Sequence, residues 1–213
     1  LRPFVASRFA DGIGQSHAGI GPMAITEAPD GTILVSGGAN RGDIWRFTRD
    51  GGTADAVPWV SLDVPIFNMA FDAEGRLWAT TGGGPLLQLD PVTGGIVERY
   101  GDGITIALAV EPERGRIFVS TNSGISVFDP DTGRFEQWSR DENLRVGALA
   151  FDNQGNLWAV TWPDRRQVVK FTPFRRAELQ LQFDSDLDSI AFGQEGSYLE
   201  DLLFVSHNAG RVD

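Results

Sequence analysis

The sequence predicts an all-β repeat protein, and two observations carry this prediction. An apolar strand, a polar turn that ends in glycine and a second apolar strand occur almost unchanged at residues 69–81 and 149–161. Weaker copies begin at Met23, Leu108 and Ile190, and the central alanines stand at positions 24, 70, 109, 150 and 191, so that the copies are 39 to 46 residues apart. A period of roughly 40 residues built from strands and turns is typical of a β-propeller with one four-stranded antiparallel blade per repeat.

This period divides the chain into about five blades within a single domain over residues 1–213. We expect the blades at about residues 20–65, 66–105, 106–145, 146–188 and 189–213, of which the last is incomplete. Alternating apolar and polar residues before the first repeat predict a closing strand and a loop over residues 1–19. Either residues 2–10 supply the missing outer strand of a closed five-bladed ring, or the chain is a fragment of a six- or seven-bladed ring in a larger polypeptide.

The residues that recur within the repeats predict how each blade is built. Small alanines suit the first strand, where the sheets crowd around the central channel. One register of the second strand carries a large apolar residue, which we expect to pack between neighbouring blades: Leu34, Trp78, Phe118, Trp158 and Phe204. The turns at residues 90–94 and 129–133 have Asp, Pro and Gly where a type I turn needs them, and they lack the alternating acids of a calcium loop.

The composition excludes several kinds of partner and chemistry. The formal net charge is −11 and the pI is about 4.6, so nucleic-acid phosphates and anionic lipid would repel the chain. A run of roughly 18 apolar residues is missing, so we expect no membrane insertion. The chain has no cysteine, which excludes disulfides, thiolate nucleophiles and zinc–thiolate sites. We expect a processed or excised piece of a secreted or cell-surface bacterial protein.

Residues 115–137 and 156–161 resemble the repeats of a known propeller superfamily. The run GRIFVSTNSGISVFDP at residues 115–130 is similar to repeats of two-component-regulator propellers, NHL proteins, streptogramin (virginiamycin B) lyases and gluconolactonase-like enzymes. The resemblance spans about residues 20–210 and rests on framework residues, so it implies the propeller fold, which enzymes and non-enzymes share. The acidic, glycine-rich character is also similar to propeller modules of very large bacterial surface proteins.

The resemblance implies an active site only where the residues of such enzymes are matched. Lyases and lactonases of this kind use His, Glu, Asn or Asp side chains around a divalent ion at the channel mouth. The lyase pattern needs a His followed closely by a Glu and a second His, but only six residues follow His207, and Asp213 is their one acid. Glu27 is the one early candidate for the lactonase glutamate. We therefore assign no catalytic residue.

In this topology the channel mouth is built by the loops between second and third strands and by the loops that lead into the next blade. These loops offer the candidate ligand-binding residues His17, Asn40, Arg41, Asn68, Asn122, Trp162, Asp164, Arg165, His207 and Asn208. Residues 162–166 place an aromatic ring beside opposite charges, which predicts a recognition tip; the alternative is a tryptophan folded back over the blade edge. The alternating Asp184, Asp186 and Asp188 are the predicted metal ligands, for Ca²⁺, with a solvated turn as the alternative.

We expect a non-catalytic module that binds a protein, a glycan or a small ligand at the channel mouth, or that serves as a spacer. Two other functions are kept as alternatives. One is a metal-dependent lyase or lactone hydrolase of the streptogramin-lyase or gluconolactonase-like type. The other is the sensor ectodomain of a signalling receptor. No cofactor other than Ca²⁺ is expected.

Overall fold

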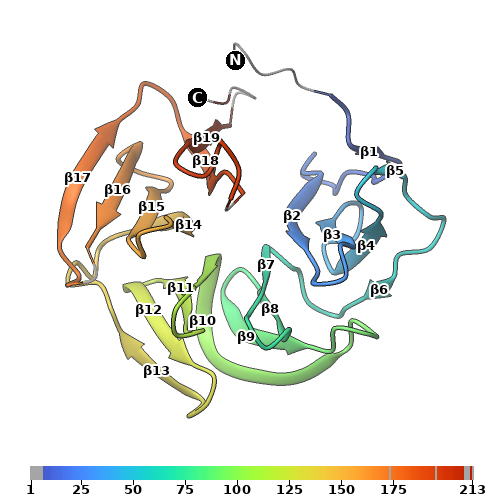
Figure 1. Ribbon diagram of the computed structural model, residues 1–213. Helices are drawn as coiled ribbons and strands as arrows, with labels where there is room; N and C mark the ends of the chain where they lie inside the picture. The colour runs from blue at the N-terminus through green and yellow to red at the C-terminus, as the bar shows by residue number, and fades with distance from the viewer. Residues whose placement is uncertain (1–6, 173, 195, 209–211, 213) are drawn as a thin grey trace. The chain divides into compact units, whose positions relative to one another are not determined.

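The computed structural model describes residues 7–172, 174–194, 196–208 and 212, and every regular element among them is a β-strand (Figure 1). The all-β prediction is therefore confirmed. In this part of the chain no helix is long and apolar enough to cross a membrane. The strands form two compact units, which we call the N-terminal unit, up to Ile104, and the C-terminal unit, from Thr105 onward. The single domain that we expected over residues 1–213 stays a prediction.

The N-terminal unit contains the first two repeats. Its first antiparallel sheet has the strand order β2 (Pro22–Glu27), β3 (Ile33–Gly37), β4 (Asp43–Phe47) and β6 (Val60–Ser61). The second repeat consists of β7 (Asn68–Phe71), β8 (Leu77–Thr80), β9 (Gly84–Leu89) and the first part of β10 (Ile96–Val110). Consecutive strands pair antiparallel, as expected of blades.

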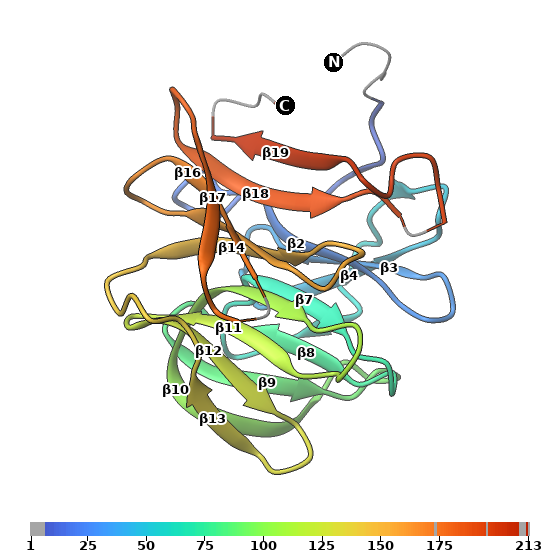
Figure 2. The ribbon, with the colours of Figure 1, turned by 60° about the vertical axis from the view of Figure 1, so that its left-hand side comes forward.

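The C-terminal unit contains the other repeats. The end of β10, β11 (Ile117–Thr121), β12 (Gly124–Asp129) and β13 (Arg134–Gln137) form the third repeat. The fourth is the four-stranded sheet of β14 (Val146–Phe151), β15 (Leu157–Thr161), β16 (Gln167–Phe171) and β17 (Ala177–Gln182), whose order can be followed in Figure 1. Figure 2 shows the paired strands β16 and β17 of this sheet from another side. Of the fifth repeat, the described residues form the two strands β18 (Leu187–Phe192) and β19 (Leu203–His207).

The start of the chain pairs with the first repeat. β1 (Ala10–Asp11) runs parallel to β5 (Gly52–Thr53), and Gly52 donates its backbone N–H to the carbonyl of Phe9 at 3.0 Å. Most of the expected closing strand, residues 1–6, lies outside the described residues. Blade number and ring closure therefore stay predictions.

The strand β10 crosses the expected boundary between the blades at residues 66–105 and 106–145, where the prediction has two separate strands. It continues without a break through residues 101–105, which the sequence pattern assigns to a connection between blades. Gly101 and Gly103 adopt φ values of 62° and 70°, and the register with β9 shifts between Tyr100 and Ile104. Glycine reaches this left-handed region without the cost that a Cβ imposes, so the chain turns inside the strand rather than leaving it.

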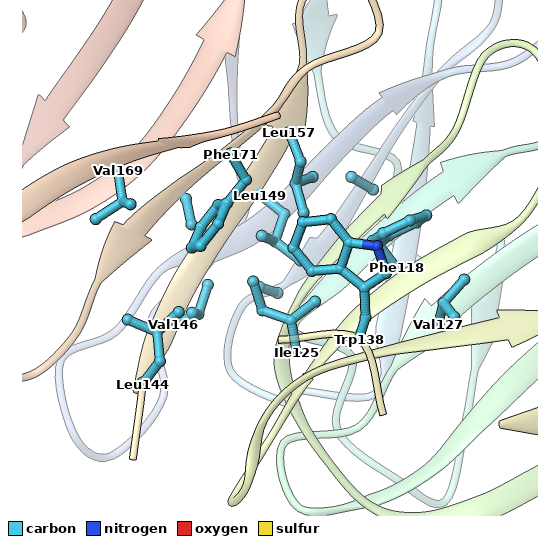
Figure 3. Packing of buried hydrophobic residues seen from close by; sticks show 13 residues of the cluster. Phe118, Ile125, Val127, Trp138, Leu144, Val146, Leu149, Leu157, Val169 and Phe171 are labelled. Carbon is cyan, nitrogen blue, oxygen red and sulfur yellow. The ribbon is translucent and has the colours of Figure 1, made fainter. Parts of the chain in front are cut away.

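One aspartate holds the repeated turn that precedes each tryptophan. Asp152 Oδ1 accepts the backbone N–H groups of Gln154 and Asn156 at 3.0 and 2.8 Å, and its Oδ2 accepts the Trp158 indole N–H at 2.9 Å. Asp72 makes the same contacts with the turn before Trp78. Trp78 is 1% exposed, which agrees with the framework role expected of this register. The core beside these turns interdigitates aromatic and branched side chains, shown for the third and fourth repeats in Figure 3.

Candidate functional site

The predicted mouth residues of the C-terminal unit lie on loops that contact one another. Arg145 donates to Asn122 Oδ1 at 3.2 Å, and the backbone N–H of Trp162 donates to the carbonyl of Arg145 at 3.0 Å. Arg165 donates to Asp141 Oδ2 at 3.2 Å. We call residues 122–123, 138–145, 162–166 and 183–186 the loop cluster. The structure thus brings Asn122, Trp162 and Arg165 to one end of this unit, as the topology predicts.

The loop over residues 162–166 contains two residues with a left-handed backbone. Arg165 and Arg166 have φ values of 71° and 51°, and the Trp162–Pro163 peptide is cis. A residue with a Cβ adopts this left-handed region at a cost of about 1–2 kcal/mol. The surrounding contacts hold both residues there: Gln182 Nε2 donates to the carbonyls of Arg165 and Arg166 at 2.9 and 3.3 Å, and the N–H of Phe183 donates to the Arg166 carbonyl.

Trp162 is the exposed aromatic side chain of the cluster. Trp162 is 43% exposed, and the start of its side chain lies against Gly147, where an added Cβ would lie 2.7 Å from the Trp162 Cβ and 3.3 Å from its Cγ. The neighbouring Asp164 is exposed and makes no ion pair with another described residue. Trp162 is thus half-exposed beside β14, and its role as a recognition tip stays a prediction. A half-exposed indole on a held backbone is a typical anchor for a ligand.

The three candidate metal ligands are not brought together. Arg166 Nε donates to Asp186 Oδ1 at 2.7 Å, and Arg166 Nη1 lies 3.5 Å from the carbonyl oxygen of Asp184. Asp188 lies exposed on β18. Among the described residues no three His, Cys, Asp or Glu side chains group as metal ligands. In the structure the Arg166 guanidinium pairs with this acidic segment, and the Ca²⁺ site stays a prediction.

His207 is buried rather than placed at the loop surface. Its side chain is 3% exposed, its Nδ1 lies 2.6 Å from Ser185 Oγ, and its ring packs edge-to-face on Phe183 at 5.5 Å. Asn208 is exposed, and its backbone N–H donates to the carbonyl of Asp186 at 3.1 Å. These contacts connect the end of β19 to the loop that precedes β18. Both residues thereby stabilise residues 183–186 of the loop cluster.

In the N-terminal unit the candidate residues mostly shape their own loops. Asn40 Nδ2 donates to Asp43 at 2.9 Å, and the Asn68 side chain accepts the N–H of Met69 at 2.8 Å. The Arg41 guanidinium lies 6.0 Å from the centre of the Phe67 ring. His17 is exposed in a short turn. Glu27, the candidate lactonase glutamate, pairs with Arg49.

Sequence reasoning missed the residues that hold the cluster together. Asp141, Arg145, Arg166 and Gln182 come from loops and strand ends 16 to 24 residues away from their partners, or bond to main-chain groups. The signal that was available is the Arg165–Arg166 pair itself, because two adjacent arginines in a tight loop of an acidic chain call for carboxylates nearby. The arrangement can present a rigid aromatic and polar surface to a ligand.

Solved structures similar to this chain include proteins of the kind that its repeats resemble. Virginiamycin B lyase from Staphylococcus aureus matches with a TM-score of 0.62 at 15% identity, over 90% of this chain and 68% of that chain. A streptogramin B lyase matches with 0.64 at 19% identity, over 91% and 65%. A luciferin-regenerating enzyme matches with 0.66 at 16% identity, over 90% and 72%. The chain thus spans about two thirds of the length of these proteins.

The resemblance to the streptogramin-lyase type of propeller is confirmed at the level of the fold. At identities of 15 to 19%, the match carries the β-propeller architecture and no residue roles. No protein-family model matches the sequence. No curated protein matches it.

Proposed function

We propose that the chain is a non-catalytic binding module whose loop cluster holds a ligand against Trp162. The observation that carries the proposal is the 43% exposed indole on a loop fixed by Gln182 and by two ion pairs. Side chains held in place before binding lose little entropy when a ligand arrives. The exposed Asp164 stands beside the ring as a hydrogen-bonding group for the ligand.

The pairing of charges within the cluster supports binding rather than chemistry. Arg165 and Arg166 are paired with Asp141 and Asp186, so these four side chains orient the loops. The ligand is a protein, a glycan or a small molecule with an apolar face that packs on the indole. We place the module in a secreted or cell-surface bacterial protein, which its acidity and lack of cysteine support.

Binding to arrayed glycans and bacterial surface-protein fragments tests this proposal. For any ligand found, Trp162→Ala should weaken binding at least about tenfold, as expected for an aromatic hot spot. Tyr198→Ala is the matched control, because Tyr198 is 89% exposed in the same unit but lies outside the loop cluster. Binding that survives Trp162→Ala and is lost with Tyr198→Ala would contradict the proposal.

A lyase or lactone hydrolase is the second candidate, and the comparisons support it, since the similar structures are named as such enzymes. The test is conversion of virginiamycin B by the purified chain, followed by mass spectrometry with added Mg²⁺ and with chelator. Under the binding proposal the compound stays intact in both. Conversion that is lost on replacing a loop-cluster residue would favour the enzyme.

We also propose that the repeats belong to a ring with more than five blades. The chain covers 65 to 72% of the similar propeller proteins, which supports this reading. The complete coding sequence tests it, because each further blade needs roughly 40 additional residues with the same strand–turn pattern. Flanking sequence without another repeat would favour the closed five-bladed ring.

A further inference from the structure

The C-terminal unit has a cavity that lies away from the loop cluster. The turns at residues 111–116 and 152–156 join first to second strands, so they stand at the other ends of β11 and β15 from the cluster. Between these turns is a cavity of about 380 Å³. Pockets for small molecules have volumes of about 300–1,000 Å³. The proposed function above makes no use of this cavity.

The floor of the cavity is aromatic. Phe118 packs edge-to-face against Trp138 at 5.3 Å and 76°, and against Phe151 at 5.1 Å and 84°. All three side chains line the cavity. Phe118 and Trp138 are only 1% and 5% exposed, so the half-buried Phe151 is the ring of this cluster that a ligand can reach. An additional ring can pack on Phe151 with the edge-to-face geometry that aromatic pairs prefer. The floor therefore favours a ligand that contains an aromatic ring.

Beside this floor, one wall of the cavity consists of an arginine and a glutamate whose charges neutralise each other. Arg116 donates through Nε and Nη2 to the two carboxylate oxygens of Glu111 at 2.7 and 2.9 Å, and its guanidinium lies 5.6 Å from the centre of the Phe118 ring. The exposed Glu113 and Arg114 at the rim also carry opposite charges. This part of the site has no net charge to attract an anion.

Phe174 stands at the rim of the cavity and is 84% exposed. A phenylalanine seldom has most of its side chain in water. Its position beside an aromatic floor offers further apolar area to a bound ring. The exposed ring is a second observation, separate from the cavity, that indicates a ligand.

A smaller adjoining cavity is acidic. It has a volume of about 180 Å³ and shares Pro112, Glu113, Phe151 and Gly155 with the first. Glu200 and Asp152 also line it, and no Lys, Arg or His stands among its described lining residues. Asp152 is taken up by its own turn, by Trp158 and by Lys170, whose Nζ lies 3.7 Å from Oδ2. Glu200 Oε2 accepts the backbone N–H of Gly196 at 2.7 Å, so Glu113 and the other oxygen of Glu200 can face a cation. An aromatic floor next to an acidic recess is complementary to a ring that carries an ammonium group.

The equivalent gap in the N-terminal unit is smaller and has a different floor. It measures about 210 Å³, and Ala28, Leu34 and Phe71 line it together with the ion pair of Arg46 and Asp30. Ala28 and Leu34 stand where the third repeat has Glu111 and Phe118, at the same places relative to the turn and the second strand. Both gaps lie between neighbouring repeats and have a paired guanidinium, but the cluster of three aromatic side chains distinguishes the one in the C-terminal unit.

We propose that the two adjoining cavities bind a small aromatic amine, with its ring between Phe151 and Phe174 and its ammonium group between Glu113 and Glu200. The net charge of −11 favours the approach of a cationic ligand to the protein. Ring and ammonium are recognised by separate groups, so each contribution can be measured on its own.

Calorimetric titration with tyramine and phenethylamine, at low ionic strength, tests the proposal. Two probes that lack the charge, benzyl alcohol and 3-phenylpropionate, report the ring alone and an anion. Both amines should bind more tightly than benzyl alcohol, and 3-phenylpropionate should bind least. Glu113→Gln should weaken the amines about threefold to fivefold and leave benzyl alcohol unchanged, as expected for an exposed ion pair of up to about 1 kcal/mol.

Gln154→Trp should block the cavity, because Gln154 is exposed at its edge and its side chain holds no part of the turn. The matched control is Glu74→Trp, at the same place in the turn of the second repeat. It should leave amine binding unchanged. Binding to both Trp variants with equal affinity, tighter binding of 3-phenylpropionate, or no heat from either amine at several millimolar would each overturn the proposal. Thermal melts confirm that each variant folds.

Discussion

Asp152 Oδ2 accepts the indole N–H of Trp158 at 2.9 Å, and Asp72 Oδ2 accepts that of Trp78 at 2.8 Å. In each repeat one carboxylate closes the turn between the first two strands and also orients the large side chain of the second. The third repeat has Glu111 and Phe118 instead, and its carboxylate turns to Arg116. The indole therefore occurs in the two repeats whose turn is closed by an aspartate, and the repeat with a glutamate has a phenylalanine in its place.

Asp152→Ala is predicted to destabilise the fold strongly. It removes the acceptor of the Gln154, Asn156 and Trp158 donors at a buried position. Unfolding in urea should show a loss of about 2–4 kcal/mol, because the donors left unpaired cost about 1–3 kcal/mol each where water cannot reach them. The exposed Asp131→Ala serves as the control and should change the unfolding free energy by less than about 0.5 kcal/mol. Equal effects in both variants would contradict this role.

The same carboxylate predicts a pH dependence of stability. Burial alone would raise the pKa of Asp152, but hydrogen bonds from Trp158 and Asn156 outweigh it, so its pKa lies below the ordinary value. Stability from this group is therefore complete above an ordinary aspartate pKa of about 3.9, and it is lost as the pH falls through the lower folded value. The difference in unfolding free energy between wild type and Asp152→Asn should stay constant from about pH 5 to 7 and shrink below about pH 3.9. A difference that grows on acidification would refute this assignment.

Gly147→Ala is predicted to move the recognition loop. The new Cβ would lie 2.7 Å from the Trp162 Cβ and 3.3 Å from its Cγ, so the loop must shift. Overpacking of this kind costs about 1–3 kcal/mol. The emission of Trp162, measured as the difference from Trp162→Phe in both backgrounds, should change, and ligand binding at the loop cluster should fall. An unchanged Trp162 signal would show that the contact does not hold the loop.

Gly51→Ala is predicted to detach β1 from β5. Gly51 has a φ of 73°, and a Cβ there would lie 1.8 Å from the carbonyl oxygen of Phe9. Gly75→Ala is the matched control, because Gly75 has a φ of 77° and nothing within 4 Å, so it carries the backbone cost alone. The amides of Gly52 and Ala54, which bond to Phe9 and Asp11, should exchange faster in Gly51→Ala and not in Gly75→Ala. Faster exchange in both would indicate a general loss of stability instead.

The sequence pattern was sufficient for elements defined by local spacing. The two clearest copies of the repeat, at residues 69–81 and 149–161, form β7 with β8 and β14 with β15. The glycines that end their turns, Gly75 and Gly155, have φ values of 77° and 75°. Alternation along a strand and a glycine at a fixed offset are properties of a few neighbouring residues, which is why they can be read without a structure.

The candidate site was predictable only in part. Topology placed Trp162 and Arg165 on the same end as Asn122, but the partner of each side chain depends on loop conformations that no local pattern fixes. Arg166 and Asp186 are 20 residues apart, and they meet because the left-handed backbone of Arg166 turns its side chain toward the next repeat's loop. The sequence does show the adjacent arginines at positions 165 and 166, but no local spacing tells which carboxylate each of them contacts.

Three tryptophans with hydrogen-bonded indole N–H groups can serve as natural spectroscopic labels. The N–H of Trp45 bonds to the carbonyl of Gly37 in the first repeat, and those of Trp78 and Trp158 bond to carboxylates in the second and fourth. Each indole proton therefore gives an NMR signal that reports on one repeat. Because repeat proteins can lose structure one unit at a time, these three signals distinguish stepwise from all-or-none melting without any added probe.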